Sequence, residues 1–234
     1  MGDEGSSARE SRRFATGRLA ARPRPPETKG PAGLHRLNLE GGRDGLVYVP
    51  KGAGERWAAP LVMLLHGAGG DARLTVTLLR DLADRHGVML LVPESRGDTW
   101  DVIAGGYGPD VAYVERALEQ TFGRYEVDPT HVAAAGFSDG ASYALSLGVT
   151  NGDLFTHVLA FSPGFIAPAW PHGSPALFIS HGTRDRVLPV NLCSRRIVPR
   201  VEAAGYEVLY REFEGPHTVP PEIAAEAVEW FLKD

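Results

Sequence analysis

The chain has 234 residues, a length that suits one domain of the larger kind. Its 43% hydrophobic and 23% charged residues are the ordinary mix of a soluble globular protein, and its net charge of -5 gives no reason to expect nucleic acid as a partner. No apolar run approaches the length of about 20 residues that a membrane-spanning helix needs.

Residues 1–33 differ in composition from the rest of the chain. The stretch "ARPRPPETKGPAG" within them is too rich in proline and glycine for a helix or an inner strand. We therefore expect a tail or wrapping segment over residues 1–33 and a catalytic domain over residues 34–234. This segment lacks the apolar core of a secretory signal, so a cytoplasmic location is expected.

From residue 34 onward, predicted strands and helices alternate along the chain. A hairpin is predicted at its start, with strands at 34–39 and 45–50 joined around "EGGRDG". The later runs predict strands at 59–67, 87–94, 131–137, 157–163, 176–182 and 206–213. The segments between and after them predict helices at 73–85, 108–125, 139–149, 191–204 and 221–232.

This alternation predicts an α/β fold with a mostly parallel central sheet and helices on both faces. The helix over 73–85 should turn Leu74, Leu78, Leu79 and Leu82 to one face. The connection between the strands at 157–163 and 176–182 is too short for a large lid domain.

The stretch "GFSDG", residues 136–140, lies between a predicted strand and a predicted helix. Such a tight turn forces strained backbone angles on its central residue, so Gly136 and Gly140 supply the small neighbours it needs. The turn lifts the Ser138 hydroxyl clear of the sheet, as in the nucleophile elbow of the α/β-hydrolases. In the alternative interpretation, Ser138 is only a helix cap that bonds to the first turn.

A serine hydroxyl becomes a good nucleophile only when a histidine, oriented by a carboxylate, takes its proton. In this fold the acid and then the histidine follow the serine, each beyond the end of a later strand. Asp185 in "ALFISHGTRDRVLP" and His217 in "YEVLYREFEGPHTVPPE" occupy those places. We therefore predict a catalytic triad of Ser138, His217 and Asp185.

Other polar residues near the strand ends compete for these roles. Glu94 and Asp101 are alternatives for the acid. His181 closes a strand and is expected to be structural, while His66 closes another and could support the site from behind. The side chain of Asp139 should cap the N–H groups of the helix that follows it.

Acyl transfer also requires N–H donors for the oxyanion. One is the backbone N–H of Asp139, and the other is expected from the loop after an earlier strand. That loop is "HGAGGD", residues 66–71. Within it we favour the N–H of Ala68, with Gly69 or Gly67 as second choices.

A metal site and a cysteine nucleophile are both disfavoured. The sequence contains no H-x-H, H-E-x-x-H or C-x-x-C pattern, so we expect neither a metal nor another cofactor. Cys193 is the single cysteine and has no adjoining motif that would supply a base.

Four motifs in order resemble the phospholipase/carboxylesterase family of α/β-hydrolases, over roughly residues 34–233. They are "LLHGAGGD", "GFSDGASYALSLG", "HGTRDRVLP" and "GPHTVPPE", and they are also similar to polyhydroxybutyrate depolymerase-like esterases. The resemblance implies the same triad and an oxyanion hole formed by the "HGAGG" loop and Asp139. The thioesterases of this family have "HGLGD" in the loop and Gln after the nucleophile, so the differences favour a general carboxylesterase.

The expected function is hydrolysis of small esters with short to medium acyl chains, through an acyl-enzyme. Trp100, Phe165 and Leu188 lie near the motif loops and could line an apolar acyl pocket, although ordinary packing would explain them equally well. An acyl or protein thioesterase, a lysophospholipase and a non-catalytic binding protein are the alternatives. Activity should rise with pH through about 6–7.5, because a histidine base must be neutral.

Overall fold

The computed structural model describes residues 12–39, 42–54 and 58–233. Within this part, one sheet runs in the order β1-β2-β4-β3-β5-β6-β7-β8. Only the β1–β2 and β2–β4 pairs are antiparallel, and every later pair is parallel. The strands are β1 (Gly33–Arg36), β2 (Leu46–Val49), β3 (Ala59–Leu65), β4 (Met89–Val92), β5 (Val127–Phe137), β6 (His157–Phe161), β7 (Ala176–Gly182) and β8 (Val208–Phe213).

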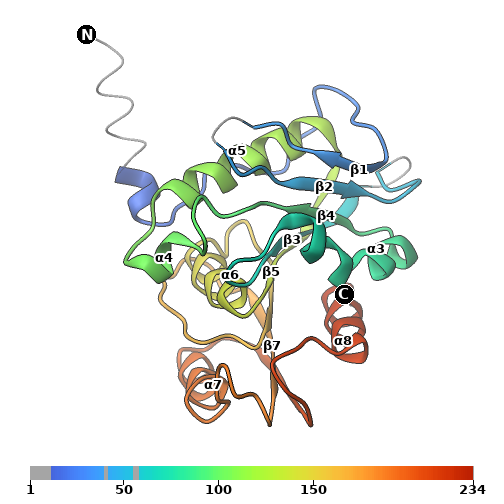
Figure 1. Ribbon diagram of the computed structural model, residues 1–234. Helices are drawn as coiled ribbons and strands as arrows, with labels where there is room; N and C mark the ends of the chain where they lie inside the picture. The colour runs from blue at the N-terminus through green and yellow to red at the C-terminus, as the bar shows by residue number, and fades with distance from the viewer. Residues whose placement is uncertain (1–11, 40–41, 55–57, 234) are drawn as a thin grey trace.

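Helices cover both faces of this sheet (Figure 1). On one face pack α5 (Pro109–Arg124), α6 (Asp139–Thr150) and α7 (Ser194–Ala203). The other face is covered by α2 (Ala72–Thr75), the 3-10 helix η1 (Val76–Leu78), α3 (Arg80–His86) and α8 (Pro221–Phe231). A short helix, α4 (Asp101–Ala104), lies at one end of the sheet. The predicted α/β architecture is confirmed.

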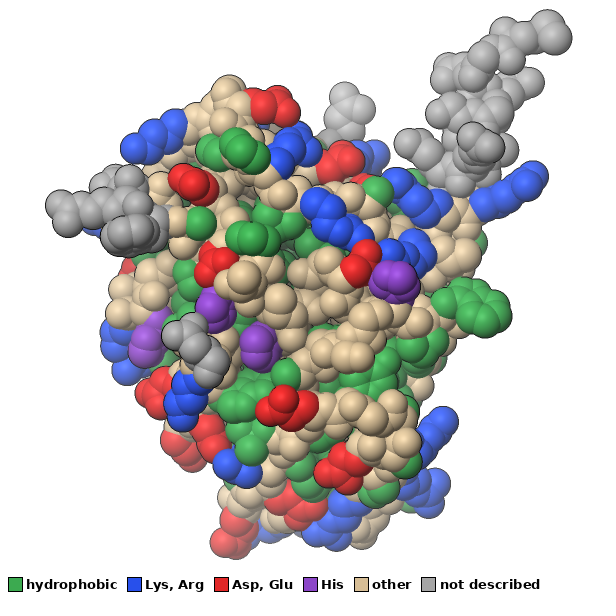
Figure 2. Space-filling view, turned by 180° about the vertical axis from the view of Figure 1, so that it is seen from behind, with side chains coloured by type: hydrophobic (Ala, Val, Ile, Leu, Met, Phe, Trp, Pro, Cys, Tyr) green, Lys and Arg blue, Asp and Glu red, His purple; other side chains and the backbone are tan. Residues whose placement is uncertain are grey.

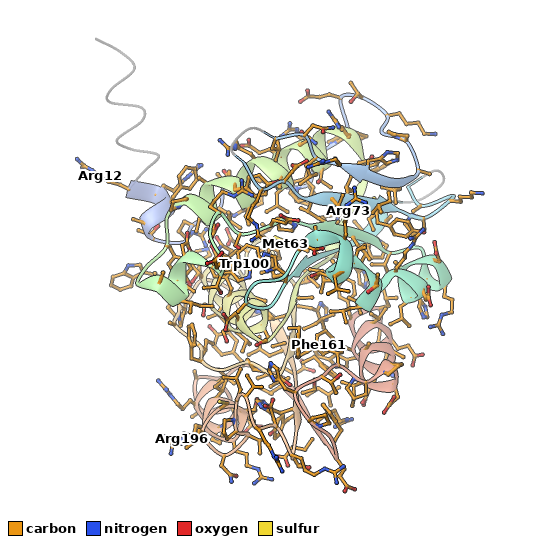
Figure 3. The ribbon with its side chains drawn as sticks, in the orientation of Figure 1. Arg12, Met63, Arg73, Trp100, Phe161 and Arg196 are labelled. Atoms are coloured by element: carbon orange, nitrogen blue, oxygen red, sulfur yellow. The ribbon has the colours of Figure 1, made fainter. Side chains whose placement is uncertain are left out.

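The central strand β3 shows why both layers are needed. Leu61, Met63 and Leu65 pack into the core under α5, α6 and α7, whereas Val62 and Leu64 pack into the opposite core. All five side chains are fully buried, because successive residues of a strand point to opposite faces. Met63 is seen in the interior of the molecule in Figure 3. Because the strands from β4 to β8 are paired in parallel, their carboxyl ends lie at the same edge of the sheet. The loops that follow these strands meet at that edge.

The helix predicted at 73–85 is broken into α2, η1 and α3. The backbone of Leu79 leaves helical values, with φ -124° and ψ 0°. Leu79 and Leu82 are buried, but Leu74 is 70% exposed, so the predicted single apolar face is wrong. Tertiary packing turns Leu79 and Leu82 onto the sheet, whereas α2 packs through Ala72 and directs Leu74 to solvent.

The remaining differences lie mostly at element ends. Strand β5 begins earlier than the predicted 131, and β1 is shorter than predicted. The predicted hairpin pairing of β1 with β2 is present, although residues 40–41 of its turn lie outside the described residues. Among the described residues, no helix is both long and apolar enough to span a membrane.

The described part of the N-terminal segment lies against the domain. Arg18 donates two hydrogen bonds to Asp153, at 3.0 and 2.9 Å, and Arg22 pairs with the same carboxylate. Burial alone would raise the pKa of Asp153, but the two guanidinium groups lower it to about 2. Figure 2 shows basic side chains gathered beside acidic ones near the N-terminal end of the chain.

We predict that Asp153→Asn loosens residues 12–33. Exposed ion pairs contribute about 0.2–1 kcal/mol each, so loss of the shared carboxylate should make tryptic cleavage within this segment about fivefold faster. Limited proteolysis followed by mass spectrometry measures the rate. Glu27→Gln, which breaks only the exposed pair with Arg24, is the control and should leave the rate unchanged. Equal rates for Asp153→Asn and the unmodified protein would contradict the anchoring role.

Candidate active site

The candidate nucleophile stands on a strained turn between β5 and α6. Ser138 has φ 57° and ψ -120°, in the region that non-glycine residues rarely adopt. A Cβ atom added to Gly136 would lie 2.3 Å from the carbonyl of Gly140, and one added to Gly140 would lie 2.3 Å from the carbonyl oxygen of Leu65. Both glycines are therefore required for α6 to begin this close to the ends of β3 and β5.

The structure brings the three predicted triad side chains together. His217 Nε2 lies 2.8 Å from Ser138 Oγ, and its Nδ1 lies 2.5 Å from Asp185 Oδ2. The other carboxylate oxygen accepts the N–H groups of Val187 and Leu188, both at 2.8 Å. Burial alone would raise the pKa of Asp185, but the Leu188 amide and His217 outweigh it and hold this pKa below its ordinary value. An ionised Asp185 keeps the proton on Nδ1, so Nε2 is free to accept from the serine.

His181 supports the loop that carries the acid. It is fully buried, its Nε2 donates to the Leu188 carbonyl at 2.7 Å, and its Nδ1 accepts from the Ser194 hydroxyl at 2.6 Å. Burial lowers the pKa of His181, which favours the neutral ring. Its Nε2 also lies 3.3 Å from Asp185 Oδ2. This histidine therefore has the structural place expected from the sequence.

The alternative acids are engaged elsewhere. Glu94 pairs with Arg43 at 3.2 Å, and Asp101 accepts two backbone N–H groups from residues 108–110. Neither is hydrogen-bonded to His217. Among the three candidate acids, Asp185 is the one whose carboxylate is hydrogen-bonded to His217.

The candidate oxyanion donors come from two converging segments. Gly69 donates its N–H to the Asp98 carbonyl at 2.7 Å, so this second-choice donor is already occupied and the prediction for it is wrong. The N–H groups of Ala68 and Asp139 donate to no protein acceptor within the described part of the chain. The N–H of Gly67, the other second choice, likewise donates to no protein acceptor among the described residues. Ala68 therefore stays the first choice and Gly67 the second, beside Asp139.

A buried histidine holds the loop that carries Ala68. His66 Nε2 accepts the Ser95 N–H at 3.0 Å, so its proton lies on Nδ1, which donates to the Gly67 carbonyl at 2.7 Å. The indole N–H of Trp100 donates to the His66 carbonyl at 2.8 Å. Burial lowers the pKa of His66, consistent with a neutral ring that positions the backbone.

Trp100 is a core residue, which corrects its assignment to the substrate pocket. Its side chain is fully buried, stacks on Tyr143 with ring centroids 4.9 Å apart, and lies 4.8 Å from His66. Figure 3 shows Trp100 inside the molecule. A buried indole needs a hydrogen-bond acceptor, and here that acceptor is the carbonyl of His66, the first residue of the oxyanion loop.

The side chain of Asp139 also differs from expectation. It accepts a hydrogen bond from the Thr99 hydroxyl at 2.7 Å, and no side-chain cap is formed at the start of α6. Thr99, Asp98 and Ser95 thus tie the loop after β4 to both oxyanion segments. The sequence did not predict the roles of these residues. Ser, Thr and Asp are common in loops, and their presence there does not indicate hydrogen bonds to distant segments.

An apolar cavity of about 380 Å³ lies beside the triad. One wall is Phe137, whose ring packs against His217 with centroids 4.6 Å apart. Neither Phe165 nor Leu188 lines this cavity; Leu188 lies beside Gly164 instead. The segment α2–η1 borders the cavity because it follows the oxyanion loop directly. The other residues that line the cavity include Ala68, Gly70, Leu74, Thr75 and Leu78.

Two other kinds of site find no support in the described part of the chain. No group of three or more His, Cys, Asp or Glu side chains there is arranged to hold a metal ion. Cys193 is buried, and burial raises the pKa of its thiol. A thiol with a raised pKa is a poor nucleophile at neutral pH.

Comparisons with known proteins bear on the fold and the family of this chain. The fold and the strand–turn–helix around Ser138 place the chain among the α/β-hydrolases. Residues 113–218 match the family model described as "Putative esterase". Among solved structures, esterase PE8 superposes with a TM-score of 0.63 at 25% identity, over 80% of this chain and 96% of that one.

Two curated relatives are also similar in sequence. "Putative esterase NocK" of Nocardia uniformis subsp. tsuyamanensis is 30% identical over 141 residues, which are 56% of this chain and 41% of that protein. "Probable feruloyl esterase C" of Aspergillus clavatus is 27% identical over 168 residues, which are 68% of this chain and 59% of that protein. The chain thus spans less than two thirds of either relative.

We predict that Gly140→Ala disrupts the elbow. The added methyl group would lie 2.3 Å from the Leu65 carbonyl oxygen, so α6 must shift, with a loss of stability of about 1–3 kcal/mol. Thermal unfolding measures the change. The matched control is Gly97→Ala, where the nearest atom to the new Cβ is 3.7 Å away and little change is expected. Equal unfolding temperatures for the two variants would contradict the close approach.

Proposed function

We propose that this protein is a serine carboxylesterase. The observation that carries the proposal is the continuous hydrogen-bonded chain from Ser138 Oγ through His217 to Asp185, with the serine held in the strained elbow. The esterase family match over residues 113–218 supports the same conclusion. The α/β-hydrolase fold alone would not support it, because one fold hosts many functions.

The proposed reaction proceeds in two steps. His217 Nε2 takes the Ser138 proton as Oγ attacks the ester carbonyl, and the N–H groups of Ala68 and Asp139 stabilise the oxyanion. The protonated His217 then gives its proton to the departing alkoxide, leaving an acyl group on Ser138. Water, deprotonated by the same histidine, hydrolyses this acyl-enzyme and releases the acid.

Buried charge orients the base in this mechanism. Asp185 is ionised at neutral pH because its pKa is lowered, so it stabilises the imidazolium that forms on His217. His181 stays neutral beside it because burial lowers the pKa of that ring. The site therefore presents one base and one anion, as proton transfer from serine requires.

The cavity beside the triad supports esters with apolar acyl groups of short to medium length. A volume of about 380 Å³ is near the small end of ordinary ligand pockets. Thioesters remain the alternative substrates, because the same nucleophile and donors serve both reactions. Turnover of matched ester and thioester pairs separates the two, and a preference for the ester is expected.

We predict that Ser138→Ala lowers hydrolysis of p-nitrophenyl butyrate by at least about 10³-fold, because the acyl-enzyme cannot form. Steady-state rates measure the loss, and circular dichroism checks that the fold is retained. Equal rates for variant and unmodified protein would mean that Ser138 is not the nucleophile. Absence of hydrolysis of both esters and thioesters by the unmodified protein would favour a non-catalytic binding protein.

We predict that Asp185→Asn lowers kcat by about 10³–10⁴-fold, because the amide no longer holds the proton on Nδ1 of His217. The same assay measures kcat. Glu94→Gln, the corresponding change at an acid that the structure pairs with Arg43, should lose less than about tenfold. A larger loss in Glu94→Gln than in Asp185→Asn would contradict the assignment of the acid.

A further inference from the structure

Two neighbouring cavities lie along the segment that follows the oxyanion loop. The first, of about 380 Å³, lies beside Phe137 and the triad. The second, of about 250 Å³, is lined by the side chains around Leu82 and by Val219, Pro221 and Ala224. Both cavities share Thr77 and Leu78 as lining residues. These two residues of η1 therefore form a ridge between the cavities.

The polar side chains that line the first cavity are already engaged. The Thr75 hydroxyl donates to the Asp71 carbonyl at 2.7 Å, and the Thr77 hydroxyl donates to the Leu74 carbonyl at 2.6 Å. Both ring nitrogens of His66 are likewise hydrogen-bonded to backbone. These lining side chains offer no spare proton to a ligand, so the cavity suits an apolar chain.

The second cavity is lined by both apolar and polar side chains. Val219 lies two residues beyond His217, so this cavity flanks the same catalytic loop. Asp81 and Arg85 also line it, and the Arg85 guanidinium donates to the Asp81 carbonyl. A chain that passed the ridge would therefore meet the apolar side chains of Leu82, Val219 and Ala224 together with the charged ones of Asp81 and Arg85.

We propose that Leu78 sets the acyl-chain length of the substrate, by closing the first cavity against the second. This inference rests on the proposed esterase function and names the specificity-determining residue of the same site. Leu78 is half-buried and belongs to the short 3-10 helix, so its side chain can be shortened or enlarged without touching the triad. Chains that fit the first cavity are hydrolysed well, and longer ones meet the Leu78 side chain.

The acyl group, rather than the alcohol, is assigned to this cavity. The acyl group stays bonded to Ser138 Oγ until water arrives, so it gains most from a walled apolar site next to Ser138. The alcohol must instead receive a proton from His217 and leave. Gly67 brings the cavity wall to the serine, since a Cβ at Gly67 would lie 3.4 Å from the Ser138 Cβ.

The test compares Leu78→Ala, Leu78→Phe and the unmodified protein on p-nitrophenyl esters from acetate to dodecanoate. One methylene in an apolar pocket changes kcat/KM by about tenfold or more. Leu78→Ala should therefore raise the ratio of kcat/KM for octanoate over butyrate by at least about tenfold, and Leu78→Phe should lower it similarly. Leu192→Ala, an exposed leucine that lines neither cavity, is the matched control and should leave the ratio unchanged.

A second series keeps the acetyl group constant and lengthens the alcohol. No shift in this series, together with opposite shifts of the two Leu78 variants in the acyl series, supports the proposal. Parallel acyl profiles for all variants, or a shift confined to the alcohol series, would overturn it while leaving the esterase function intact. If the unmodified protein hydrolysed none of these esters, the proposed function itself would fail. Thermal unfolding of each variant shows that changed ratios come from folded protein.

Discussion

The close contact between the start of α6 and the ends of β3 and β5 is the constraint on which the site depends. It exists because Gly136 and Gly140 have no side chains, and it holds Ser138 at φ 57°. Strain at a single residue persists only when surrounding structure over-determines it. Here strand β3, fully buried over residues 61–65 and packed on both faces, supplies that rigidity and fixes where the nucleophile stands.

Around this elbow, hydrogen bonds from three loops bring the other groups into place. His66 and Trp100 hold the loop with Ala68 through backbone atoms, and Thr99 joins the loop after β4 to Asp139. His181 performs a comparable task under Asp185. Each buried polar group among these has a partner, which is what makes such networks rigid. Preorganised donors of this kind favour stabilisation of charge that develops during a reaction.

The fold and the proximity of the three candidate triad side chains follow from strong local sequence patterns. The buried strands follow from continuous apolar runs, and Ser138, Asp185 and His217 follow from strand ends in the right order. The break at Leu79, the exposure of Leu74 and the burial of Trp100 could not be predicted. Each depends on tertiary packing that overrides a local pattern. Likewise, nothing in the local sequence shows that the Gly69 amide is taken by the Asp98 carbonyl.

The most direct test of the account is to trap the acyl-enzyme. The protein is mixed with p-nitrophenyl acetate, quenched in acid within the first turnovers, digested, and analysed by mass spectrometry. We predict one acetyl group on the peptide that carries Ser138, and its loss in His217→Ala. An acetyl group on Cys193 or on another residue, with Ser138 unmodified while substrate is consumed, would contradict the central claim.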